Sequence, residues 1–166
     1  MSKTAFRGSP AHTNGELPKI GSVAHFSKLV KNDLSEVTNE NYQGLFKVIS
    51  IFPSIDTGVC AASVRTFNKE AASLKNTVVL NVALDLPFAM ARFCGAEGIT
   101  NVETLSAFKS SFGKEWGLEL IDTPLSGLLA RAVVVLSPEN KVLYTELVSD
   151  IVNEPNYKAA LEALKV

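Results

Sequence analysis

Apolar residues concentrate in two runs that predict β-strands, and a helical segment separates them. Residues 47–52 are largely apolar and β-branched, and residues 77–83 form a near-continuous apolar run, as expected for a strand covered on both faces. In residues 60–75 the larger apolar side chains recur at spacings of three and four: Val64, Phe67, Ala71 and Leu74. That spacing is typical of an amphipathic helix. Strand, helix and strand predict a right-handed βαβ unit with parallel strands.

Three further helices are predicted, at residues 87–94, 105–112 and 157–164. The first has a proline at its first position and Gly95 just after its end, which is the usual asymmetry of helix termini. The last has the apolar face of an amphipathic helix.

Two more strands are predicted near the C-terminus, at residues 132–136 and 142–147. Only a short turn joins them, so they must be antiparallel neighbours. Residues 1–45 are rich in Gly, Pro, Ser and Asn and predict short strands and turns, with a hairpin around Asn14-Gly15. The order of elements is that of an α/β thioredoxin-like fold, a central mixed sheet flanked by helices, with an N-terminal β extension. We expect one domain over residues 1–166.

The charge composition of the chain bears on which classes of macromolecule it could bind. The 166 residues include 16 basic and 17 acidic side chains, for a net charge of −1, and no basic patch stands out. Nucleic acid and membrane are therefore not expected as partners. No segment approaches the ~18 apolar residues of a membrane span. The first ten residues lack the apolar stretch of a secretory signal, so we expect a cytoplasmic protein, with the periplasm as the open alternative.

The chain has only two cysteines, Cys60 and Cys94. In a reducing compartment cysteines are more often catalytic, redox-active or metal-binding than structural staples. The alternative is a pair of inert thiols that pack like small apolar side chains. Zinc sites need about four ligands with close pairing, which neither the cysteines nor His12 and His25 provide. We expect no metal and no cofactor.

The two cysteines occupy opposite ends of predicted helices. Thr57 is a good N-cap, which places Cys60 in a first turn, where free N–H groups and the helix dipole favour a thiolate. Asp56 opposes this if its carboxylate points at the sulfur. Cys94 lies in a last turn, where a thiolate is disfavoured, although Arg92 is near in sequence. The asymmetry suggests that Cys60 attacks and Cys94 responds.

The residues around Cys60 favour one chemistry over two others. A cysteine protease needs a histidine beside the sulfur, and both histidines lie in irregular N-terminal sequence. A dithiol oxidoreductase needs a second cysteine where this chain has Thr57. A threonine hydroxyl can instead orient an oxygen next to the sulfur, which points to a peroxide. Pro53 would shield the thiolate and its sulfenic acid product from water.

The spacing Pro53-x3-Thr57-x2-Cys60 resembles the active-site pattern of the peroxiredoxins. Residues 51–65 and the block Arg-Phe-Cys-Gly-Ala-Glu-Gly at 92–98 resemble the bacterial thiol peroxidase branch, and the similarity extends over nearly the whole chain. The branch usually has a glutamine where this chain has Met90, which leaves the polarity around the Cys94 helix open.

The resemblance implies a set of roles. Cys60 would be the peroxidatic cysteine, oxidised to sulfenic acid by hydrogen peroxide or an organic hydroperoxide. Cys94 would be the resolving cysteine that forms an intramolecular disulfide with it, which thioredoxin then reduces. Thr57 and Arg131 would orient the peroxide and Pro53 would shield the site. Members of the branch are typically homodimers.

Two alternatives remain open at this point. In the first, the chain is a peroxide sensor or redox relay that passes oxidation from Cys60 to a partner protein. In the second, it is a holdase or interaction module with inert thiols. Arg65, on the helix after Cys60, is a rival cation that we interpret as a solvated or paired side chain.

Overall fold

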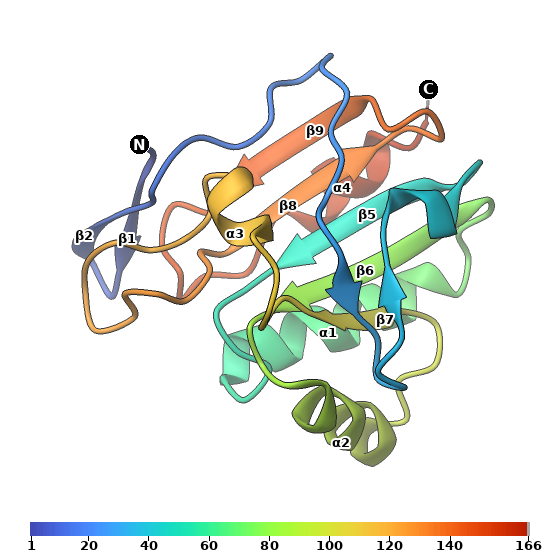
Figure 1. Cartoon of the computed structure of the whole chain (residues 1–166), viewed down its shortest axis with the longest axis horizontal. Helices are drawn as coiled ribbons and strands as arrows, with labels where there is room; N and C mark the ends of the chain where they lie inside the picture. The colour runs from blue at the N-terminus through green and yellow to red at the C-terminus, as the bar shows by residue number, and fades with distance from the viewer. Residues whose placement is uncertain (166) are drawn as a thin grey trace.

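The computed structural model describes residues 1–165, and its centre is a mixed sheet with the strand order β4-β3-β7-β6-β5-β8-β9 (Figure 1). The strands are β1 (Lys3–Phe6), β2 (Ser9–His12), β3 (Leu29–Val30), β4 (Glu36–Val37), β5 (Phe46–Ile51), β6 (Thr77–Ala83), β7 (Glu103–Ser106), β8 (Ala132–Leu136) and β9 (Val142–Leu147). The helices are α1 (Gly58–Ala71), α2 (Pro87–Glu97), α3 (Phe112–Glu115) and α4 (Tyr157–Glu162), with a 3-10 turn at Asn39–Tyr42.

The predicted βαβ unit and the C-terminal strand pair are confirmed. β5 and β6 pair in parallel on either side of α1 in sequence, and β8 pairs antiparallel with both β5 and β9. The predicted bounds of β6, β8 and β9 match those observed. The predicted mixed α/β sheet flanked by helices is therefore what the chain forms.

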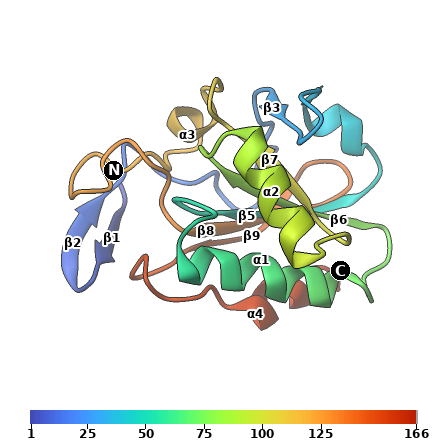
Figure 2. The ribbon, with the colours of Figure 1, turned by 90° about the horizontal axis from the view of Figure 1, so that it is seen from below.

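Two apolar layers cover the sheet. Helices α1 and α4 lie along one face, and α3 lies on the other side (Figure 2). Side chains of α1, α2 and α4 pack with Val48, Val79 and Val133 of the central strands. Phe112 and Trp116 pack against the opposite face, with their ring centroids 4.8 Å apart. Both faces of the central strands are thus buried, which explains their continuous apolar sequence.

The predicted helix at 105–112 is wrong. The chain forms β7 there, and β7 pairs in parallel with β6, so that Leu105 lies opposite Val82. Only the short α3 follows. Without β7 the backbone groups along that edge of β6 would lack partners, and this pairing outweighs the local helix preference.

The predicted position of the hairpin and one helix end also need correction. The β1–β2 hairpin turns at Arg7-Gly8, both with positive φ, rather than at Asn14-Gly15. Asn14 instead accepts the N–H of Glu119 across the molecule. Helix α2 continues past Gly95 to Glu97 and ends at Gly98, whose left-handed backbone (φ 65°) supplies the C-cap.

No helix within residues 1–165 has the length and apolar content needed to cross a membrane.

Candidate active site

Cys60 lies in the first turn of α1, directly beyond the loop that follows β5. Thr57 caps the helix as predicted: its Oγ1 accepts the N–H of Cys60 at 3.4 Å and donates to the carbonyl of Ser54 at 3.2 Å. Asp85, after β6, fixes the same loop by accepting the hydroxyl of Ser54 at 2.8 Å and the N–H of Ile55 at 3.0 Å. The parallel strands therefore bring two carboxyl-terminal loops together to hold the start of α1.

Arg131 is the cation closest to the sulfur of Cys60 in the contacts of the described residues. It directly precedes β8, is only 3% exposed, and its Nη2 donates to Sγ of Cys60 at 3.2 Å. Its Nε donates to the carbonyl of Ile151 at 2.7 Å. No carboxylate within residues 1–165 forms a salt bridge with this guanidinium. A buried positive charge needs a compensating negative charge, so this environment favours Cys60 as a thiolate.

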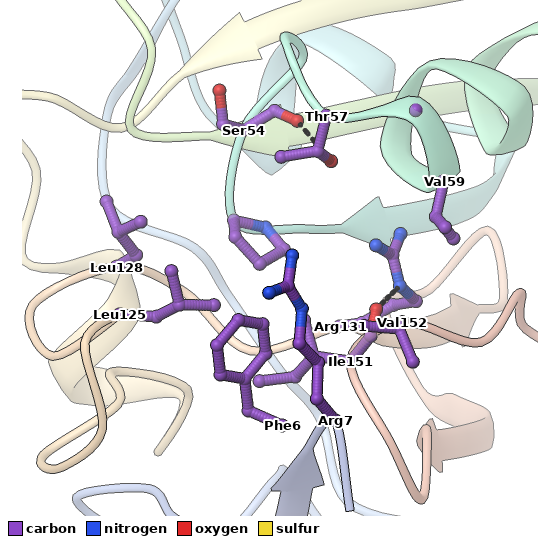
Figure 3. Close-up of a pocket in the computed structure, with 12 residues that line it drawn as sticks. Phe6, Arg7, Ser54, Thr57, Val59, Leu125, Leu128, Arg131, Ile151 and Val152 are labelled. Carbon is purple, nitrogen blue, oxygen red and sulfur yellow. Dashed lines mark hydrogen bonds between the residues drawn. The ribbon is translucent and has the colours of Figure 1, made fainter.

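A cavity of about 330 Å³ opens beside Arg131 and the start of α1 (Figure 3). Pro53, Thr57 and Arg131 line it, while Cys60 itself is fully buried and lies outside its lining. Nη1 of Arg131 has no hydrogen-bond partner among the described residues. An unpaired donor at the wall of a cavity can bind a ligand oxygen there.

Two ion pairs near α1 are directed away from Cys60. Asp56 pairs with Arg92 at 3.1 Å on the surface, so its carboxylate is engaged away from the sulfur, and Arg92 is engaged away from Cys94. Arg65 pairs with Glu97 at 2.9 Å, as interpreted from the sequence. Asp56 therefore does not work against a thiolate at Cys60.

Neither histidine supports a cysteine–histidine dyad. Nδ1 of His12 lies 2.7 Å from a carboxylate oxygen of Asp122, and His25 is exposed on the loop before β3. The part of the chain that the structure describes shows no hydrogen bond between either histidine and Cys60.

Cys94 is not part of this cluster. It lies in the last turn of α2, its Sγ is 3.4 Å from Oγ1 of Thr104, and it lines a separate cavity of about 230 Å³. Both thiols are free. The structure thus brings Pro53, Thr57, Cys60 and Arg131 together and leaves Cys94 on its own helix. The Met90 side chain is fully buried in the apolar layer beneath α2, so no polar residue is needed there.

Sequence reasoning missed the N-terminal hairpin as part of the site. Phe6 and Arg7 line the cavity, and Figure 3 shows the Arg7 guanidinium directed toward the loop that carries Ser54. Asp150 anchors the hairpin by accepting the N–H groups of Gly8 at 2.8 Å and Arg7 at 3.1 Å. The hydrogen bond from Gly8 foremost, then one from the N–H of Val152 and the one from Arg7, hold the pKa of Asp150 below its ordinary value. Nothing in the sequence links residue 7 with residue 150.

Comparison with known proteins identifies the family. The Redoxin family profile matches residues 10–161. The chain is 54% identical over 165 residues to the thiol peroxidase of Corynebacterium glutamicum and 49% identical over 164 residues to that of Mycobacterium tuberculosis, with 99% of each chain covered. These names do not favour the relay alternative.

Solved structures agree on the fold. A peroxiredoxin-like protein from Aquifex aeolicus superposes with a TM-score of 0.93 at 33% identity, covering 99% of this chain and 97% of its own. A thiol peroxidase from Chromobacterium violaceum gives a TM-score of 0.90 at 20% identity, covering 98% and 95%. The predicted thioredoxin-like fold is confirmed. The chain belongs to the Redoxin family and, within it, to the thiol peroxidases.

Proposed function

We propose that this thiol peroxidase reduces hydrogen peroxide and organic hydroperoxides with Cys60 as the attacking thiolate. The observation that carries the proposal is the buried 3.2 Å hydrogen bond from Arg131 Nη2 to Cys60 Sγ, at the wall of a cavity. That contact supplies a positive charge to the nucleophile without any histidine.

In the first step the Cys60 thiolate attacks the terminal oxygen of the hydroperoxide and the O–O bond breaks. Sulfur gains the oxygen as a sulfenic acid, and the leaving alkoxide or hydroxide takes up a proton to become an alcohol or water. Arg131 supports this role because its Nη1 is free to donate to a substrate oxygen. Thr57 and Pro53 line the same cavity as Arg131. Fixed donors of this kind stabilise the charge that develops on the leaving oxygen.

In the second step Cys94 attacks the sulfur of the Cys60 sulfenic acid. An S–S bond forms, the S–O bond breaks, and water leaves with the proton of Cys94. The two sulfurs have different hydrogen-bond partners in the reduced structure, Arg131 for Cys60 and Thr104 for Cys94, so this step requires Cys94 to leave Thr104. Thioredoxin would then return both thiols by supplying two electrons and two protons. We further propose a cytoplasmic homodimer.

The test is the intact mass of the reduced protein after one equivalent of hydroperoxide, with free thiols counted. We expect the monomer to lose two hydrogens and both thiols. The Cys94→Ser variant should stop at a sulfenic acid that a dimedone-type reagent traps, and Cys60→Ser should not react. Unchanged mass with two free thiols in the parent protein would refute the proposal.

A further inference from the structure

A hydrogen bond holds the sulfur of Cys94 to the central sheet. Thr104 lies on β7 and is only 3% exposed. Its Oγ1 is 3.4 Å from Sγ of Cys94, on α2, and this is the side-chain hydrogen bond that the structure gives Cys94. The last turn of α2 is therefore attached to β7 through its cysteine.

The direction of this bond follows from the second partner of Thr104. The Thr104 hydroxyl donates to Oδ1 of Asn32 at 2.9 Å, in the loop after β3. A hydroxyl has one hydrogen to donate, so Thr104 can only accept from Cys94. The cysteine must then be a protonated thiol, and the chain of donors runs from Cys94 through Thr104 to Asn32.

The two cysteines thus have opposite hydrogen-bonding environments. Cys60 accepts from a guanidinium, which suits a thiolate. Cys94 donates to a hydroxyl whose own hydrogen is committed elsewhere, which suits a thiol. The difference lies in β7 and the loop after β3, elements to which sequence reasoning assigned no role.

We propose that Thr104, oriented by Asn32, is a positioning residue that keeps Cys94 protonated and attached to β7 until Cys60 has been oxidised. The inference rests on the proposed role of Cys94 as resolving cysteine. Formation of the disulfide requires the Cys94 sulfur to leave Thr104 and its proton to depart with the water released from Cys60. Thr104 therefore slows resolution and lengthens the lifetime of the sulfenic acid.

The first experiment measures the hydrogen bond without any peroxide. In a Cys60→Ser background Cys94 is the sole thiol, and it lines a cavity through which a small reagent such as iodoacetamide can reach it. Adding Thr104→Val should raise the alkylation rate by roughly two- to tenfold, the size of one modest hydrogen bond. Thr104→Ser should restore the slow rate because it keeps the hydroxyl.

A matched control is Thr13→Val. Thr13 is also buried, and its hydroxyl also makes two hydrogen bonds: it accepts the N–H of Ser2 and donates to the carbonyl of Gly15. Thr13 lies just after β2, however, and among the described residues no hydrogen bond joins it to Cys94. We expect this variant to leave the alkylation rate of Cys94 unchanged. Equal alkylation rates in Thr104→Val and the Cys60→Ser parent, or equal acceleration in Thr13→Val, would overturn the inference.

The second experiment follows resolution in the chain that keeps both cysteines. After one equivalent of hydroperoxide, Thr104→Val should convert the sulfenic acid to the disulfide two- to tenfold faster than the parent and Thr104→Ser. Slower oxidation of Cys60 in Thr104→Val would indicate general damage and would overturn the inference. If the parent itself forms a sulfenic acid but never a disulfide, the proposed role of Cys94 fails instead, and the alkylation rates still decide whether Thr104 holds the thiol.

Discussion

The contact between Arg131 and Cys60 gives the sharpest prediction. Replacing Arg131 with methionine keeps an unbranched apolar stem but removes all the donors, including Nη2 on the sulfur and the free Nη1. A hydrogen bond that involves a charged group contributes about 1.5–3 kcal/mol. If that stabilisation is realised as the thiolate attacks, the rate constant for Cys60 oxidation should fall roughly 10- to 100-fold.

The assay is a single turnover in a Cys94→Ser background, so that only the first step is observed. The second-order rate constant for Cys60 oxidation is measured against a competing thiol peroxidase or reporter thiol of known rate. Arg131→Lys should give an intermediate rate. Lysine keeps the positive charge, but its single ammonium group cannot donate to Sγ of Cys60 and to the carbonyl of Ile151 at the same time, as the guanidinium does.

Arg65→Met serves as the control for loss of a positive charge near α1. Arg65 is about half exposed and pairs with Glu97, so its removal should cost little and leave the rate unchanged. Arg131→Met also leaves the carbonyl of Ile151 unpaired, so its rate must be measured well below its melting temperature. A folded Arg131→Met protein that is oxidised within twofold of the parent rate would refute the assigned role of this arginine.

Three other outcomes are expected. Thr57→Val should lower the free energy of unfolding by about 1 kcal/mol through loss of the α1 cap, and it should also slow Cys60 oxidation. Thr57→Ser should do neither. Chemical denaturation measures the first effect and the single-turnover assay the second, and a Thr57→Val protein that matches the parent in both would contradict the prediction. The pKa of Asp150 is lowered, so its stabilisation of the hairpin is present at neutral pH and is lost as pH falls through that lowered value. Amide exchange at Gly8 should accelerate there, and Asp150→Asn should weaken the pH dependence; an exchange rate independent of this carboxyl would contradict the assignment. Gly117→Ala should lower the melting temperature, because φ is 67° and a Cβ would collide with the backbone of Glu16.

Sequence reasoning predicted best those elements in which the order of apolar and polar residues directly reflects which side chains are buried. The β-branched runs of β6 and β8 are almost entirely apolar because both faces of each strand are covered; Asn81 is the polar exception within the β6 run. Thr57 could be recognised as a cap because capping depends on residues three positions apart. Local chemistry therefore placed Cys60 in the first turn of a helix without any tertiary information.

The failures have a tertiary cause. β7 is a four-residue strand with two polar residues on its helix-facing side, Thr104 and Ser106, so its sequence lacks the apolar continuity of β6. Its pairing with β6 on one side and β3 on the other defines it. Arg131 is similar: its resemblance to a family residue suggested a role, but its contact with Cys60 depends on β8 lying next to β5. Arg7 and Asp150 had no signal at all, because their contact joins the two ends of the chain.

The packing of the two cysteine helices indicates which one gives way when the proposed disulfide forms. Helix α1 buries five residues, has a side-chain cap at Thr57 and holds Cys60 against Arg131. Helix α2 buries only three, and its N-cap Leu86 makes no side-chain hydrogen bond. Unwinding the end of α2 exposes fewer buried side chains than unwinding α1, and it breaks the hydrogen bond of Cys94 to Thr104. The lower free-energy route therefore brings Cys94 to Cys60, and it leaves Pro53 and Arg131, which we propose to bind and shield the peroxide, in place for the next cycle.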